Sequence, residues 1–171
     1  MTEKIDFQKS VFWVVAMTGI AFGVIFNFLP MTPLWLDEAQ SASIAEESFS
    51  SLVEALRHDG HPPLYYFLLG FWADLFGNSD FTLRAFSGLL GCLAIVMTWF
   101  TFRIHMGKRE SLIAASLMAS SPFAIRYATE VRMYSLIIFL LLCVYLNFYK
   151  ATVTQNSNTK NRFFCAVSLA C

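Results

Sequence analysis

Two adjacent carboxylates, Asp37 and Glu38, follow the first long apolar run of the chain in the stretch LWLDEAQSA. A carboxylate is costly to dehydrate, so a pair at a membrane boundary needs a reason. One reason is general base catalysis, in which a carboxylate takes the proton of an attacking hydroxyl. The other is local, because an aspartate caps a following helix and a first-turn glutamate favours the helix dipole. The residues alone leave both interpretations open.

Two further stretches contain groups suited to binding an anionic substrate. In DGHPPLYY, a Pro-Pro pair prevents a helix from running back through His61, and Tyr65 follows. The stretch SPFAIRYATEVRMYS lies between two apolar segments and contains Arg126, Tyr127, Glu130, Arg132 and Tyr134. Ionisable groups at membrane depth are expensive and mark a functional site by default.

Bases outside the lysine-containing patches are all arginine: Arg57, Arg84, Arg126 and Arg132. Arginine has a planar fork that binds phosphate oxygens in a bidentate way, whereas lysine acts as a point charge. Beside a carboxylate pair, these arginines favour an anionic, lipid-linked substrate. The alternatives are plainer: each arginine snorkels to a lipid headgroup or pairs with an acid such as Glu130, and His61 caps its segment.

The elements that must position these groups are membrane segments. The chain is 57% hydrophobic and 14% charged, whereas an ordinary soluble domain is about 25% charged. Its mean hydropathy is +0.56. The net charge is zero, so no global field recruits nucleic acid. The four cysteines have no CxxC or Cys/His spacing, which argues against a zinc site or a disulfide framework.

We expect an all-α membrane protein, a multi-span helical bundle that forms a single domain over residues 1–171. Apolar runs predict spans at about 11–29, 82–102, 111–125 and 131–149, and another span begins at 163. Residues 30–60 are expected to form an outer loop with an amphipathic helix, and 61–76 an interfacial or re-entrant segment. Because the last apolar run is unfinished, we interpret the chain as the N-terminal part of a longer protein.

The positive-inside rule orients these segments, because lysines and arginines in short loops stay in the cytoplasm. Every lysine falls in one of three patches, at 4–9, 103–109 and 150–162. If 61–76 does not cross, all three patches share the cytoplasmic side and 30–81 lies outside. The loop 126–132 then meets Asp37 and Glu38 on the outer face. We therefore predict a multi-pass protein of the cell inner or plasma membrane.

The order of these motifs resembles that of the polytopic glycosyltransferases of the GT-C superfold, in the branch of protein O-mannosyltransferase-like and aminoarabinose-transferase-like enzymes. The resemblance covers about residues 11–150. It rests on four motifs in this order: the DE pair, GHPPLYY, LFGNSDFTLRAFSGLLG and SPFAIRYATEVRMYS. The resemblance implies transfer of a sugar from a polyprenyl-phosphate donor to a lipid, polysaccharide or protein acceptor outside the membrane. It also implies an essential acid in the first outer loop, here Asp37 with Glu38 beside it, and a second acid, here Glu130.

The resemblance thus suggests a role for each candidate residue. Asp37 would be the base, and Glu38 would orient the acceptor or hold Asp37. The donor phosphate would be held by His61, Arg84, Arg126 and Arg132, and the sugar or prenyl groove would be lined by Tyr65, Tyr127 and Tyr134. Asp37 and Glu130 could also bind Mg²⁺ or Mn²⁺, which prefer oxygen ligands. The proposed chemistry does not require this metal, and Glu130 could instead only form an ion pair with Arg126 or Arg132.

Two other classes of protein compete with a transferase. A transporter or channel subunit would place its ionisable residues within the spans, whereas these cluster at span ends. A non-catalytic fragment or membrane scaffold would explain the apolar segments but not the convergence of acids and arginines. Several more spans beyond residue 171 would favour the transferase. A truncated chain could lack part of the donor groove and be inactive alone.

Overall fold

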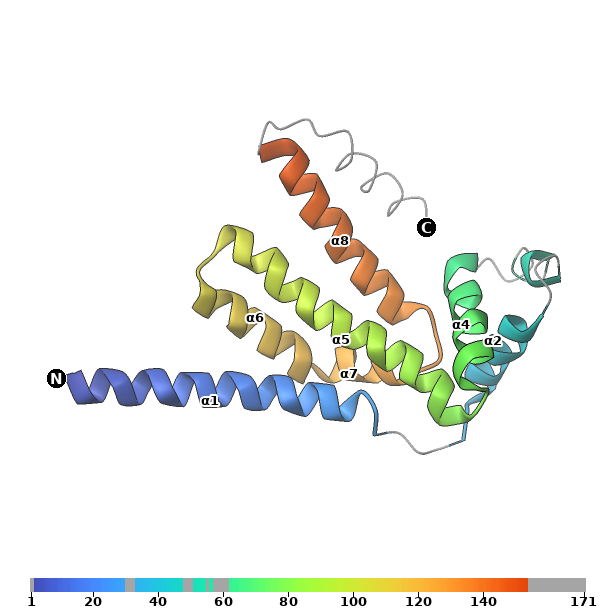
Figure 1. The fold of residues 1–171 in the computed structure, drawn as a ribbon, viewed down its shortest axis with the longest axis horizontal. Helices are drawn as coiled ribbons and strands as arrows, with labels where there is room; N and C mark the ends of the chain where they lie inside the picture. Colours follow the sequence, from blue (N-terminus) through green and yellow to red (C-terminus); the bar gives the residue numbers. More distant parts are fainter. Residues whose placement is uncertain (1, 30–32, 48–50, 55, 57–61, 154–171) are drawn as a thin grey trace.

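The computed structural model describes residues 2–29, 33–47, 51–54, 56 and 62–153, and its named elements are all α-helices (Figure 1). They are α1 (Thr2–Phe26), α2 (Leu36–Glu46), α4 (Pro63–Phe76), α5 (Asp80–His105), α6 (Lys108–Ser120), α7 (Pro122–Thr129) and α8 (Tyr134–Val153). The prediction of an all-α chain is confirmed for the described residues.

Local sequence signals explain where several helices begin and end. Helix α4 begins at Pro63, a first-turn position where the missing amide hydrogen has no cost. It ends at Phe76 and is followed by Gly77, whose φ of 93° few other residues adopt. Helix α5 begins after Ser79, whose side chain accepts a hydrogen bond from the backbone N–H of Thr82 at 3.2 Å. The Pro-Pro pair therefore lies at the start of a helix, with Pro62 as the N-cap and Pro63 as the first residue of α4.

One described helix, α5, is long and apolar enough to cross a membrane by itself. Helices α7 and α8 meet the same criterion only as a pair, and they are bent by 119° relative to each other. The expected segment 111–125 is divided, because α6 ends at Ser120 and α7 begins at Pro122. Proline breaks a helix by removing one hydrogen bond and clashing with the preceding turn. The multi-span bundle therefore remains a prediction beyond α5.

The helices form a bundle with a smaller helical group at one end (Figure 1). Helix α5 packs against α6, α7 and α8, and α1 runs beside α6. The pair α2 and α4 packs near the beginning of α5. The largest apolar core lies there and includes Tyr65, Leu69, Leu83, Phe86, Val131 and Leu136. This core joins the group formed by α2 and α4 to the bend between α7 and α8.

Side-chain contacts join the α5–α6 region, at the end of the bundle opposite α2 and α4, to helices α1 and α8. The guanidinium carbon of Arg109 lies 4.6 Å from the ring centroid of Phe12 in α1. The ring of His105 lies 4.1 Å from that of Tyr149 near the end of α8. Phe12 of α1 and Tyr149 near the end of α8 therefore both lie beside the α5–α6 region. The predicted topology requires this arrangement.

Close approach of α1 to α6 depends on two glycines, Gly19 and Gly23. A Cβ atom on Gly23 would lie 2.1 Å from the carbonyl oxygen of Ala119, and one on Gly19 would lie 2.3 Å from Oγ of Ser116. Only a residue without a side chain fits such a contact between helices. This packing holds the second half of α1 against α6.

Candidate active site

Glu38 is a buried carboxylate that accepts hydrogen bonds from three separate segments. Its relative exposure is 2%. Arg84 of α5 donates from Nε to Oε1 at 3.1 Å and from Nη2 to Oε2 at 2.6 Å. The backbone N–H of Trp35 donates to Oε2 at 2.9 Å, and that of Val131 donates to Oε1 at 3.0 Å. Glu38 therefore ties together the start of α2, the first turns of α5 and the link between α7 and α8.

Arg84, the partner of Glu38 in this network, is also buried and hydrogen-bonded. Its relative exposure is 4%, and it also donates from Nη2 to the carbonyl oxygen of Pro33 at 3.1 Å. Burying two charges is costly, and a fully hydrogen-bonded geometry offsets that cost. The expected contact of Arg84 with a donor phosphate, and of Glu38 with an acceptor, would require this network to open.

The protonation of Glu38 follows from the same contacts. Burial by itself raises the pKa of Glu38, but the hydrogen bonds from Arg84, Trp35 and Val131, with the charge of Arg84, outweigh burial and leave the pKa below its usual value. Glu38 is therefore ionised at neutral pH. Because the folded-state pKa is lowered, the network stabilises the fold above the usual glutamate range, and this contribution is lost as the pH falls through the lowered pKa.

Asp37, the neighbouring acid, has the opposite environment. Its side chain is 63% exposed, and Oδ2 accepts a hydrogen bond from Nη1 of Arg132, 95 residues away in the chain. The prediction that the loop 126–132 meets Asp37 and Glu38 is confirmed. Trp35 occupies the N-cap position of α2 and Asp37 lies in its first turn. The alternative that Asp37 caps this helix is therefore wrong.

Two tyrosines complete what we name the Asp37–Arg132 cluster, which consists of Asp37, Arg132, Tyr134 and Tyr127. The guanidinium carbon of Arg132 lies 5.4 Å from the ring centroid of Tyr134, a distance typical of a cation–π contact. The rings of Tyr134 and Tyr127 lie 4.7 Å apart. Oγ of Ser135 donates to the carbonyl oxygen of Tyr127 at 2.9 Å, which fixes the bend between α7 and α8.

Other predicted site residues lie in different environments. Arg126 donates from Nε to Oε1 of Glu130 at 3.1 Å, one helical turn along the chain, with side-chain exposures of 69% and 27%. Tyr65 is 1% exposed, and its hydroxyl lies 2.8 Å from Oγ of Ser87. Tyr65 is therefore in the core, and not at an open groove, in this conformation. His61 and Arg57 lie outside the described residues.

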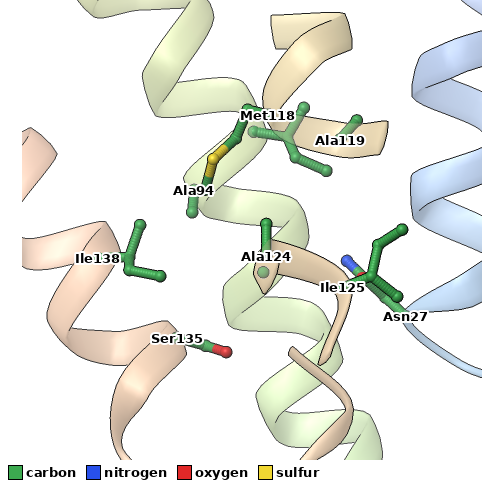
Figure 2. A pocket seen from close by; sticks show the side chains of 10 residues that line it. Asn27, Ala94, Met118, Ala119, Ala124, Ile125, Ser135 and Ile138 are labelled. Carbon is green, nitrogen blue, oxygen red and sulfur yellow. The ribbon is translucent and has the colours of Figure 1, made fainter. Parts of the chain in front are cut away.

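A cavity near the cluster is too small for a substrate. It lies among the ends of α1 and α6 and the helices α5, α7 and α8, with the polar side chains of Asn27 and Ser135 among apolar ones (Figure 2). Its volume of about 10 Å³ has room for roughly one water molecule. This cavity is therefore a packing void and not a substrate site.

The metal prediction involves carboxylates that already have partners. Asp37 pairs with Arg132 and Glu130 pairs with Arg126. In the part of the chain that the structure describes, no three His, Cys, Asp or Glu side chains gather as they would around a metal ion. Two carboxylates could still share an ion with substrate phosphate, as Mg²⁺ sites often do, so the Mg²⁺ or Mn²⁺ site stays a prediction.

Sequence reasoning missed the backbone donors at this site. The N–H groups of Trp35 and Val131 and the hydroxyl of Ser87 have no signature of their own in a sequence. One usable signal was present, because Arg84 interrupts the apolar stretch TLRAFSG. A cation buried in an apolar helix needs an anion, and the DE pair was the available one.

Comparison with protein families identifies the chain. A family described as dolichyl-phosphate-mannose-protein mannosyltransferase matches residues 60–171. Because this match covers more than half of the chain, the chain belongs to that family of GT-C-type glycosyltransferases, and the resemblance seen in the sequence is confirmed. The family implies a lipid-linked sugar donor and an acceptor. Asp37 and Glu38 precede the matched region. No solved structure matches the chain.

The two adjacent acids should differ sharply in their effect on stability. Glu38→Ala leaves the buried charge of Arg84 without its anion, which should lower the free energy of unfolding by about 3–5 kcal/mol. Asp37→Ala removes a largely exposed ion pair and should lower it by less than about 1 kcal/mol. Thermal and denaturant unfolding of both variants in detergent would measure the difference. Equal losses would contradict the network described for Glu38.

Acid should weaken the fold partly through Glu38. As the pH falls below the usual glutamate pKa of about 4.3, the unfolded chain takes up a proton at this position that the folded chain resists. The melting temperature of the wild-type protein should therefore fall more steeply with acid than that of Glu38→Gln, whose side chain does not titrate. Parallel pH profiles for the two proteins would show that Glu38 contributes nothing to acid sensitivity.

Proposed function

We propose that this member of the dolichyl-phosphate-mannose-protein mannosyltransferase family transfers a sugar from a polyprenyl-phosphate donor to an acceptor on the outer side of the membrane. One observation carries the proposal: the contact between Asp37 and Arg132 joins a carboxylate suited to act as a base to an arginine suited to bind phosphate. These side chains come from segments 95 residues apart. Their meeting on an exposed face supports a shared chemical role.

In the proposed reaction, a hydroxyl of the acceptor attacks the anomeric carbon of the donor sugar. The new carbon–oxygen bond forms as the bond from that carbon to the phosphate oxygen breaks, and the bonding pair leaves with the polyprenyl phosphate. Asp37 takes the hydroxyl proton as general base. Arg132 stabilises the charge that grows on the departing phosphate. Phosphate is a good leaving group, so no general acid is needed.

Glu38 acts in this proposal as a positioning residue. By accepting hydrogen bonds from the backbone N–H groups of Trp35 and Val131, Glu38 fixes the backbone close to Asp37 and Arg132. Arg84 serves the same purpose as the cation that keeps Glu38 buried and ionised. Both acids of the DE pair are thus needed, but only Asp37 would touch the substrate.

The remaining predicted site residues would bind the donor around the Asp37–Arg132 pair. Tyr134 lies beside Arg132, Tyr127 lies beside Tyr134, and both would line the sugar or prenyl groove. Arg126 is the more exposed arginine and would give the phosphate a second contact, with Glu130 as its partner while the site is empty. His61 would hold the phosphate from the start of the α4 segment. A Mg²⁺ or Mn²⁺ ion on Asp37 and Glu130 has no part in the proposed reaction.

The proposed topology places the Asp37–Arg132 cluster outside the cell and the basic patches inside. The N-terminus lies in the cytoplasm, residues 30–81 lie outside, and the α5–α6 turn returns to the cytoplasm. The contacts of Arg109 with Phe12 and of His105 with Tyr149 support this, because they bring the basic α5–α6 region close to the residues that follow the first basic patch and precede Lys150. The protein would then be a multi-pass component of the cell inner or plasma membrane.

Loss of the Asp37 carboxylate should stop transfer without unfolding the protein. Asp37→Asn keeps the size of the side chain but cannot accept a proton, so transfer should fall by about 100-fold or more. Asp80→Asn is a matched control, because Asp80 lies in the first turn of α5 and outside the cluster. Sugar transfer by the purified full-length protein, with melting temperatures, would measure both. Normal turnover by a stable Asp37→Asn protein would remove Asp37 from the reaction.

The topology can be tested with one cysteine placed at Lys108, in a variant from which the native cysteines have been removed. A membrane-impermeant thiol reagent should label this cysteine only after the membrane is opened, because Lys108 begins α6 at the basic end of the bundle. A cysteine at Asp74 of α4 is the matching outer position and should be labelled in intact cells. Labelling of position 108 in intact cells would overturn the proposed topology.

A further inference from the structure

The two adjacent carboxylates are held in very different ways. Glu38 and Arg84 have side-chain exposures of 3% and 5%, and Glu38 accepts four hydrogen bonds. Asp37 and Arg132 have exposures of 63% and 23%. An exposed ion pair exchanges partners easily, whereas a buried one does not. The contact between Asp37 and Arg132 can therefore open while Glu38 keeps the start of α2 in place.

Arg132 is anchored independently of Asp37. Its backbone N–H donates to the carbonyl oxygen of Glu130 at 2.8 Å, and the preceding N–H, of Val131, donates to Glu38. Its guanidinium lies against the ring of Tyr134. These contacts hold the guanidinium at the cluster whichever anion it binds. A guanidinium favours the bidentate geometry of a phosphate.

The charges around Arg132 leave Asp37 as the group that opposes an incoming phosphate. Glu38 is neutralised by Arg84 in the interior, and Glu130 pairs with Arg126. A phosphate that reaches Arg132 would meet the carboxylate of Asp37 already bound to the same guanidinium. Like charges at this distance repel, so the two anions disfavour each other's occupancy.

We propose that Asp37 and the phosphate of the lipid donor compete for Arg132, so that the carboxylate is released toward the acceptor only when the donor is bound. This inference rests on the proposed function of the cluster and adds its regulation. The empty site keeps its base engaged with Arg132. Donor binding exchanges the carboxylate for phosphate on Arg132 and leaves Asp37 free at the open face. The acceptor should consequently bind productively after the donor.

The competition predicts that removing the negative charge of Asp37 improves phosphate binding while transfer is lost. Full-length wild-type and Asp37→Asn proteins in detergent would be titrated with farnesyl phosphate in the presence of a chelator. Loss of one exposed ion-pair partner should tighten binding by about three- to fivefold. Glu130→Gln, which removes an equal charge beside a different arginine, should change the affinity by less than about twofold.

A double-mutant cycle shows whether the effect acts through Arg132. In an Arg132→Gln background, Asp37→Asn should no longer tighten binding by more than about twofold. If the single variant Asp37→Asn, with Arg132 intact, binds farnesyl phosphate no more tightly than the wild type, the competition is overturned. If Arg132→Gln does not fold, the comparison of Asp37→Asn with Glu130→Gln decides the question. If the wild-type protein transfers no sugar and binds no farnesyl phosphate, the proposed function fails together with the competition. If the wild-type protein transfers sugar normally but Asp37→Asn does not bind farnesyl phosphate more tightly, only the competition is overturned.

Discussion

A carboxylate that is 2% exposed and yet ionised is the constraint on which this structure depends. Glu38 can be buried as an anion only if donors surround it, and those donors come from three segments that are distant in the chain. Satisfying Glu38 therefore fixes the start of α2, the beginning of α5 and the link between α7 and α8 relative to one another. The apolar core around Tyr65, Leu69 and Val131 forms at the same junction. The hydrogen bonds of Glu38 and the packing of this core thus favour the same arrangement of α2 and α4 against α5.

This arrangement separates two tasks between neighbouring acids. In a helix, successive side chains point about 100° apart, so Glu38 can face the interior while Asp37 faces outward. The buried acid orients the backbone, and the exposed acid meets Arg132 beside two tyrosines. The basic residues Arg103, Lys108 and Arg109 lie at the far end of α5, away from this cluster. This separation fits the proposed topology, in which the cluster lies outside and the basic residues lie in the cytoplasm.

Sequence patterns predicted the parts of this account that depend on composition and on local signals. Hydropathy identified α5, the Pro-Pro pair placed the start of α4, and lysine distribution required the loop 126–132 to meet the DE pair. The division of 111–125 at Pro122 was missed because its apolar residues continue across the proline. The burial of Tyr65 could not be predicted, because its partner Ser87 lies 22 residues away. The pairing of Arg84 with Glu38, 46 residues away, was missed although an arginine within an apolar helix calls for an anion. Motif order suggested the family, but it could not tell which member of the DE pair is buried.

The central claim is that Glu38 and Arg84 form the scaffold while Asp37 and Arg132 meet the substrate. A structure of the full-length protein by electron cryomicroscopy, with an isoprenyl phosphate bound, tests this most directly. The account predicts phosphate density on Arg132, with Asp37 turned away from it and Glu38 still bound to Arg84. Phosphate bound by Arg84, with Glu38 displaced from it, would contradict the account.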